Sequence, residues 1–172
     1  MGGALIGVLL VACLVAGFLA VTYVVKHRIP LLTDTEFKAA SNRWSETLPD
    51  SYTMEIQIGG NQPGVVQAVI QHQNVVSLSR NGKPITQERI WEYWTVPFLL
   101  NAIGEDLETQ QNPQQKAERF KVSPGTDMTL RAEFDPVFGY PTRYRRTIAG
   151  TNQEIEWSIT RFEKMLVGKE SD

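Results

Sequence analysis

The chain has 172 residues, the size of one domain, and it carries 17 Lys and Arg against 19 Asp and Glu. Two of the basic residues lie within the first 28 positions and every acidic residue follows them. Residues 29–172 therefore carry 15 positive and 19 negative charges, a formal charge of −4. A mildly acidic domain gives no electrostatic reason to expect nucleic acid as a partner. The single cysteine excludes an intramolecular disulfide and any zinc site that needs two thiolates from one chain.

The first segment has the pattern of a membrane-spanning helix. Residues 4–25 contain no charged residue and no proline, and a helix of that length, at about 1.5 Å per residue, covers a hydrocarbon core of about 30 Å. Lys26 and Arg28 follow directly and would flank the anchor. We therefore predict a transmembrane anchor over residues 1–28 and a single soluble domain over residues 29–172, in a single-pass membrane protein.

A lipoprotein signal peptide is the main alternative for this segment. Residues 10–13 resemble a lipobox that ends in Cys13, although no Lys or Arg precedes the apolar run and the run continues for 12 residues past Cys13. The side of the membrane is a separate question. The positive-inside rule, applied to Lys26 and Arg28 alone, places the domain in the cytoplasm. Uncleaved N-terminal anchors often carry exported domains, and we expect an extracytoplasmic domain.

A helix is predicted over residues 35–48, after a short apolar connector. Thr33 or Asp34 supplies the N-cap oxygen, and apolar residues at three- and four-residue steps form one stripe in which Trp44 is a core residue. Period-two alternation then predicts strands at about residues 52–58, 65–72 and 74–80. The glycine-rich residues 59–64 and the Asn-Gly pair at 81–82 are turns, so the three strands form an antiparallel meander.

The second half of the domain mixes helix, loop and strand signals. Residues 87–96 fit an aromatic strand or a helical turn, and Pro97 disfavours helix at Val96, so extended structure is predicted. A helix follows over about residues 96–107 with Thr95 as N-cap. Residues 110–115 are predicted as a polar loop, and strands at about 117–122, 128–134, 142–148 and 153–162. The predicted fold class is α+β, with an N-terminal transmembrane helix followed by a curved antiparallel sheet packed on one or two helices.

Few residues in the sequence could carry catalysis. His27 and His72 are the two histidines, and nothing places an acid-oriented base beside a nucleophile. The glycine-rich residues 59–64 lack the Lys-Ser/Thr ending of a phosphate-binding loop. We predict no catalytic residue, no cofactor and no metal site, and favour a non-enzymatic domain. A hydrolase with dispersed carboxylates and a carrier of an apolar ligand are the alternatives.

Two groups of residues are candidate binding positions. The first is the aromatic cluster of Trp91, Tyr93, Trp94 and Phe98, which can line a groove, meet the bilayer interface or fill the core. The sequence of this segment does not decide between these three roles.

The second group follows a tight connection at residues 134–141. Gly139 can take positive φ there, and Tyr140 is held extended before a proline. On the strand that follows, Arg143 and Arg145 share one face, where they can bind an anionic partner or pair with acids of the sheet. Tyr140, Arg143 and Arg145 are therefore candidate binding residues.

Four features of the domain carry a resemblance to a known family. They are an early helix holding Trp44, a Tyr-x-Met-Glu-Ile strand starting at Tyr52, a hairpin at residues 80–84, and an Asp-Pro-x-x-Gly-Tyr-Pro turn at residues 135–141. With these features, residues 37–162 resemble a family of small bacterial membrane-anchored or lipoprotein-like domains of unknown function. The resemblance implies an exported domain of the bacterial envelope and no particular activity.

These observations predict a membrane-anchored, non-enzymatic binding or accessory domain that acts at the membrane surface. The connector at residues 29–33 is short, so the expected partner is a protein close to the bilayer, and the chain could be a subunit of a larger membrane complex.

Overall fold

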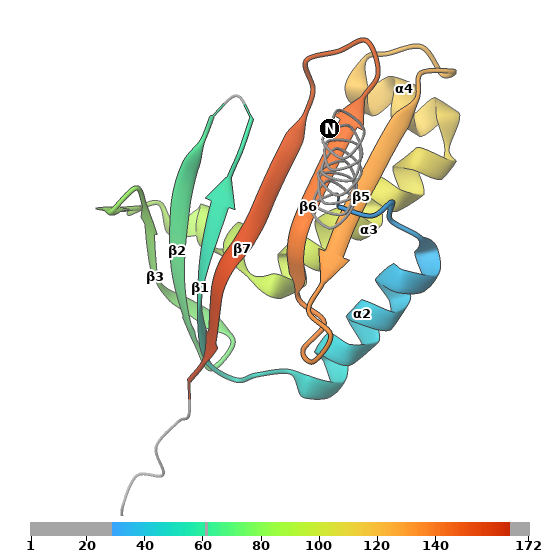
Figure 1. Cartoon of the computed structure of the whole chain (residues 1–172). Coiled ribbons are helices and arrows are strands. Elements are labelled where there is room, and N and C mark those ends of the chain that lie inside the picture. Colours follow the sequence, from blue (N-terminus) through green and yellow to red (C-terminus); the bar gives the residue numbers. More distant parts are fainter. Residues whose placement is uncertain (1–28, 61, 166–172) are drawn as a thin grey trace, which may run out of the picture.

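The computed structural model describes residues 29–60 and 62–165, which form one seven-stranded antiparallel sheet with its helices on one face (Figure 1). The strand order is β4-β3-β2-β1-β7-β6-β5. The sheet thus consists of two meanders, β1 to β4 and β5 to β7, and the pairing of β1 with β7 joins them. The strands are β1 Tyr52–Ile58, β2 Gly64–Gln71, β3 Asn74–Arg80, β4 Lys83–Pro84, β5 Met128–Phe134, β6 Pro141–Ile148 and β7 Ile155–Lys164.

The helices within these residues are α2 Asp34–Thr47, the 3-10 helix η1 Glu88–Trp94, α3 Val96–Gln111 and α4 Pro113–Phe120. Helix α2 starts in a capping box whose N-cap is Thr33, one of the two residues that the sequence predicts for this position. The Thr33 hydroxyl accepts a hydrogen bond from the Glu36 N–H, and the Glu36 carboxylate accepts one from the Thr33 N–H. Trp44 is buried in the core, which confirms its predicted place.

Helix α3 covers the centre of the sheet. Its N-terminal half packs with β1, β2 and β3 in one apolar cluster, and its C-terminal half packs with β5 and β6 in a second cluster. Figure 1 shows α3 behind the sheet and α2 beside the β5 edge. Helix α3 is the main cover of the sheet, since seven of its residues are buried against two for α2.

The predicted fold class is wrong as stated, although an α+β chain with an antiparallel sheet is confirmed. Within residues 29–60 and 62–165, no helix is both long enough and apolar enough to cross a membrane. The sheet also carries three α-helices and a 3-10 helix instead of one or two helices. The predicted spanning segment, residues 4–25, and its flank Lys26 and Arg28 lie outside the described residues.

Three predicted segments of the middle region are also wrong. Residues 88–94, predicted as extended, form η1, in which the aromatic side chains turn around a helix axis. Residues 110–115 and 117–122, predicted as loop and strand, are the end of α3 and most of α4. The Asn112 side chain caps α4 by accepting from the Gln115 N–H, and Pro113 occupies the first turn, so both apparent loop signals are helix-start signals.

Candidate binding surface on the open face of the sheet

Among residues 29–60 and 62–165, no helix packs on one face of the sheet, and we call this the open face. Antiparallel sheets commonly leave one face in solvent, and strand alternation places the polar residues of β5, β6 and β7 on it. The open face is hollowed over these strands, with a pocket of about 400 Å³. We call this pocket the arginine hollow; it is lined by Ile29, Arg131, Arg143, Arg145, Glu156, Trp157 and Ser158.

The strand register brings like charges together at the arginine hollow. Arg131 of β5 lies directly opposite Arg145 of β6, and Arg145 in turn lies opposite Glu156 of β7. Two residues along each strand, Glu133 lies opposite Arg143. Directly opposed residues of an antiparallel pair have side chains on the same face, so the three guanidinium groups share one surface.

Glutamates hold two of the three arginines. Arg143 makes a bidentate pair with Glu133, with its Nε 2.8 Å from Oε2 and its Nη2 2.5 Å from Oε1. These hydrogen bonds raise the pKa of the Arg143 guanidinium above its ordinary value. The Nε of Arg145 lies 2.8 Å from Oε1 of Glu154 and 3.9 Å from Oε2 of Glu156. Sequence reasoning places Arg143 and Arg145 on one face, and the register confirms this.

Arg131 is held differently from the other two arginines. Its Nη1 donates to the Ile29 carbonyl at 2.7 Å, and within the described residues no carboxylate is paired with it. Leu31 pairs with Arg131 in an isolated bridge, so the two side chains share the open face, and Leu31 is 58% exposed. The arginine hollow is thus bordered by apolar side chains of the segment that enters α2.

The aromatic cluster predicted from the sequence does not form one surface. Trp91 and Trp94 pack against the core, and the indole Nε1 of Trp91 donates to the Ile85 carbonyl at 2.9 Å. Tyr93 and Phe98 stay exposed and lie against each other, with ring centroids 4.7 Å apart. None of the four aromatic residues lines the arginine hollow.

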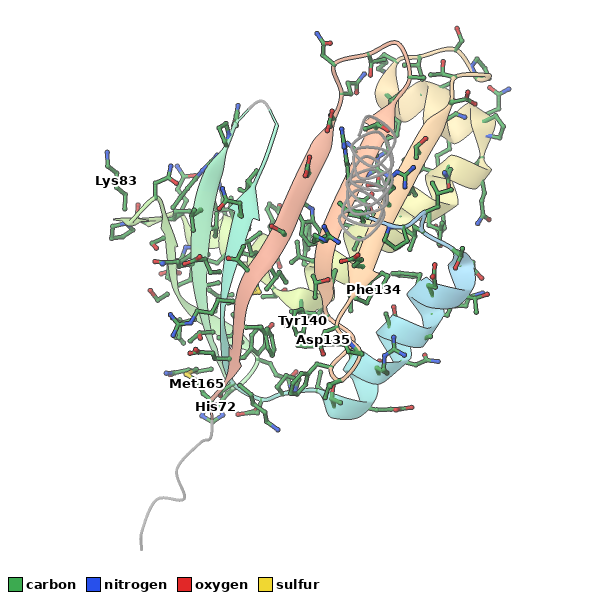
Figure 2. The ribbon with its side chains drawn as sticks, viewed as in Figure 1. His72, Lys83, Phe134, Asp135, Tyr140 and Met165 are labelled. Carbon is green, nitrogen blue, oxygen red and sulfur yellow. The ribbon has the colours of Figure 1, made fainter. Side chains whose placement is uncertain are left out.

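Tyr140 belongs to the tight connection between β5 and β6. Its ring stacks on Phe162 with centroids 4.3 Å apart, and partial burial, followed by the charge of Asp135, raises the pKa of its hydroxyl. The Asp135 carboxylate accepts from the N–H groups of Val137 and Phe138, which closes the turn. Figure 2 shows Asp135 and Tyr140 together at this end of β5 and β6. Tyr140 therefore has a structural position away from the arginine hollow.

His72 lies in the turn between β2 and β3, next to Met165 at the lower end of the sheet in Figure 2. Its Nδ1 is 2.8 Å from the Asp50 carboxylate, and the Ser51 hydroxyl donates to the same carboxylate at 3.1 Å. A catalytic triad needs the histidine ring on the serine hydroxyl, whereas here both groups contact the aspartate. The His72 side chain is 73% exposed, so this contact is a surface ion pair at most.

Arg131 and Leu31 are among the residues of this surface that the sequence analysis did not name as candidates. Alternation in the predicted strand 128–134 already puts Thr129, Arg131 and Glu133 on its polar face, and that signal could have found Arg131. Leu31 joins the surface through a bridge to a residue 100 positions away, which no local pattern indicates.

Over residues 29–60 and 62–165, no group of three or more His, Cys, Asp and Glu side chains is arranged to hold a metal ion. Compared with known protein families, curated proteins and solved structures, the chain matches none of them. The resemblance to membrane-anchored envelope domains and the extracytoplasmic location therefore stay predictions.

Proposed function

We propose that this chain is a non-enzymatic binding or accessory domain, and that the open face of its sheet binds an acidic segment of a protein partner. The residues that would contact the partner are Arg131, Arg143 and Arg145, with Ile29 and Leu31 beside them. The domain would act by holding its partner and not by transforming it.

The opposed pair Arg131 and Arg145 is the observation that carries this proposal. Like charges directly opposite each other across two strands destabilise a sheet by a few tenths to about 1 kcal/mol. A local feature that opposes folding is expected where function requires it. A partner carboxylate placed between the two guanidinium groups would remove the repulsion. The free energy that the repulsion costs in folding would then be recovered on binding.

The glutamates around the arginine hollow do not prevent such binding. Arg143, Arg145 and their acidic partners are between about 31% and 46% exposed, and exposed ion pairs contribute only about 0–1 kcal/mol. They hold the guanidinium groups in position, while Arg131 has a carbonyl oxygen as its acceptor. Guanidinium groups bind carboxylates through two parallel hydrogen bonds, which makes an acidic side chain a fitting ligand.

Fluorescence anisotropy with a labelled peptide of alternating Glu and Leu residues tests this proposal on the full chain. The double variant Arg131→Gln, Arg145→Gln should bind the peptide at least about ten-fold more weakly than the wild type, because two charge-assisted contacts are lost. Arg161→Gln is the matched control, since Arg161 is an exposed arginine of β7 that pairs with Glu163 outside the hollow.

Binding should also weaken as salt rises, and a peptide with Lys in place of Glu should not bind. Equal affinity of the double variant and the wild type would exclude the open face as the binding surface. Equal binding of the Glu and Lys peptides would exclude an acidic ligand.

A further inference from the structure

A second pocket, of about 540 Å³, lies between α2 and the edge of the sheet at β5. We call it the α2–β5 pocket. Much of its lining is apolar, with Ala39 on α2, Ala132 and Phe134 on β5, and two prolines, Pro30 and Pro136. Figure 2 shows Phe134 near the end of β5 that lies beside α2. The volume is in the range of small-molecule sites, about 300–1,000 Å³.

One cation that lines the α2–β5 pocket makes no ion pair, although two carboxylates line the pocket as well. Glu36 and Glu133 both line it, but Glu36 closes the capping box with Thr33 and Glu133 holds Arg143. Arg43 of α2 is the lining cation, and over the described residues its guanidinium has neither an ion pair nor a hydrogen bond. The pocket therefore combines apolar walls with one arginine whose anionic partner is not supplied by the described chain.

Because it is partly buried, Arg43 is a stronger indication of a site for an anion than a fully exposed arginine would be. Arg43 is half-buried, and its Nε is completely shielded from solvent without an acceptor. A shielded donor without an acceptor is unfavourable, and a turn of the Arg43 side chain toward an oxygen bound in the pocket would satisfy it. The planar fork of a guanidinium matches a carboxylate or a phosphate through two parallel hydrogen bonds, and the two glutamates of the lining disfavour the doubly charged phosphate.

We propose that the α2–β5 pocket binds a small monocarboxylate with an aliphatic or aromatic body. The carboxylate would lie on the Arg43 guanidinium, and the body would pack between Ala39 and Phe134. This site is separate from the arginine hollow, because the two pockets share no lining residue, and it does not depend on the function proposed for the open face.

Calorimetric titration of the full chain with 4-phenylbutyrate tests this proposal, with 4-phenylbutanol as the uncharged ligand of the same shape. The full chain is kept in a nonionic detergent, and each variant is first checked for an unchanged circular dichroism spectrum. The wild type should bind 4-phenylbutyrate more tightly than 4-phenylbutanol. Arg43→Met should weaken binding of the carboxylate at least about ten-fold and leave binding of the alcohol unchanged, because only the charged contact is lost.

Two further variants make the test specific. Ala39→Leu fills the pocket and keeps Arg43, so it should weaken both ligands. Lys38→Met removes one positive charge from the same helix outside the pocket, where Lys38 pairs with Asp34, and should change neither affinity. Equal binding of 4-phenylbutyrate by the wild type and Arg43→Met, or no effect of Ala39→Leu, would overturn the proposal. The proposal would also be overturned if a tetrapeptide with a free C-terminal carboxylate bound to the chain and 4-phenylbutyrate did not.

Discussion

Arg131 and Arg145 lie directly opposite each other across β5 and β6, and within residues 29–60 and 62–165 the guanidinium of Arg131 is held by the carbonyl oxygen of Ile29. Replacing Arg131 with Gln removes one hydrogen bond and one like-charge contact, which act in opposite directions. We expect the free energy of unfolding to change by less than about 1 kcal/mol in urea denaturation. A loss of more than about 2 kcal/mol would show that Arg131 stabilises the fold and would remove the reason to assign it to binding.

Asp106 is the buried charge on which the second apolar cluster depends. Its carboxylate accepts from the Tyr144 hydroxyl at 2.6 Å and from Nη1 of Arg146 at 2.8 Å, and Arg119 lies 3.3 Å away. Asp106→Ala leaves a buried guanidinium without its acid, so we expect a loss of about 3–5 kcal/mol in thermal or urea unfolding. The exposed Glu108 on the same helix is the control, and Glu108→Ala should stay within about 0.5 kcal/mol. Similar losses in both variants would contradict this assignment.

Gly139 closes the turn against helix α2 with φ of +82°. A Cβ at this position would lie 2.2 Å from the Ala40 carbonyl oxygen, so Gly139→Ala must displace α2 or the turn. Gly150 has a similar φ of +71° and nothing within 4 Å, so Gly150→Ala costs only the backbone strain of about 1–2 kcal/mol. We expect a much lower melting temperature for Gly139→Ala than for Gly150→Ala. Equal melting temperatures would mean that the turn does not pack on α2 as described.

Tyr52 links stability to alkaline pH. Burial raises the pKa of its hydroxyl from the ordinary value of 10 to about 12, and the hydroxyl accepts from the Val96 N–H. The folded state therefore keeps the proton longer than the unfolded state does. The contribution of the Tyr52 hydroxyl to the free energy of unfolding is complete below pH 10. It falls by about 2–3 kcal/mol as the pH rises to 12. Urea denaturation of Tyr52→Phe should show a flatter decline over this range, whereas Tyr93→Phe, at an exposed tyrosine, should keep the wild-type slope. A wild-type slope in Tyr52→Phe would contradict the raised pKa.

Much of the sheet can be predicted from the sequence, because each strand has one covered and one solvent-exposed face. Tyr52, Met54 and Ile56 alternate with polar residues, and the structure buries these three. The 3-10 helix η1 could not be recognised in the same way. Glu92 separates Trp91 from Tyr93 as it would in a strand, whereas in the structure Trp91 and Trp94 pack against the core from a helical turn. Helix α4 is missed for a different reason, since Asn112 and Pro113 also occur in turns.

The candidate site is less predictable than the fold. A period of two puts Arg143 and Arg145 on one face, but the residue opposite each of them depends on how β5 and β7 are aligned with β6. That alignment depends on pairing between separate segments of the chain, and no local sequence pattern indicates it. The same holds for Arg43, which has the pattern of an ordinary helical surface residue until the edge of β5 lies beside it.

The most direct test of the binding function maps where an acidic ligand lies on the folded chain. Two-dimensional amide NMR spectra of the full chain are recorded while the peptide of alternating Glu and Leu residues is added. The proposed function predicts shift changes concentrated at Ile29, Leu31, Arg131, Arg143 and Arg145, and their loss in the double variant Arg131→Gln, Arg145→Gln. Changes concentrated on α2, α3 or the exposed pair Tyr93 and Phe98, or an unchanged spectrum at saturating peptide, would contradict binding at the open face.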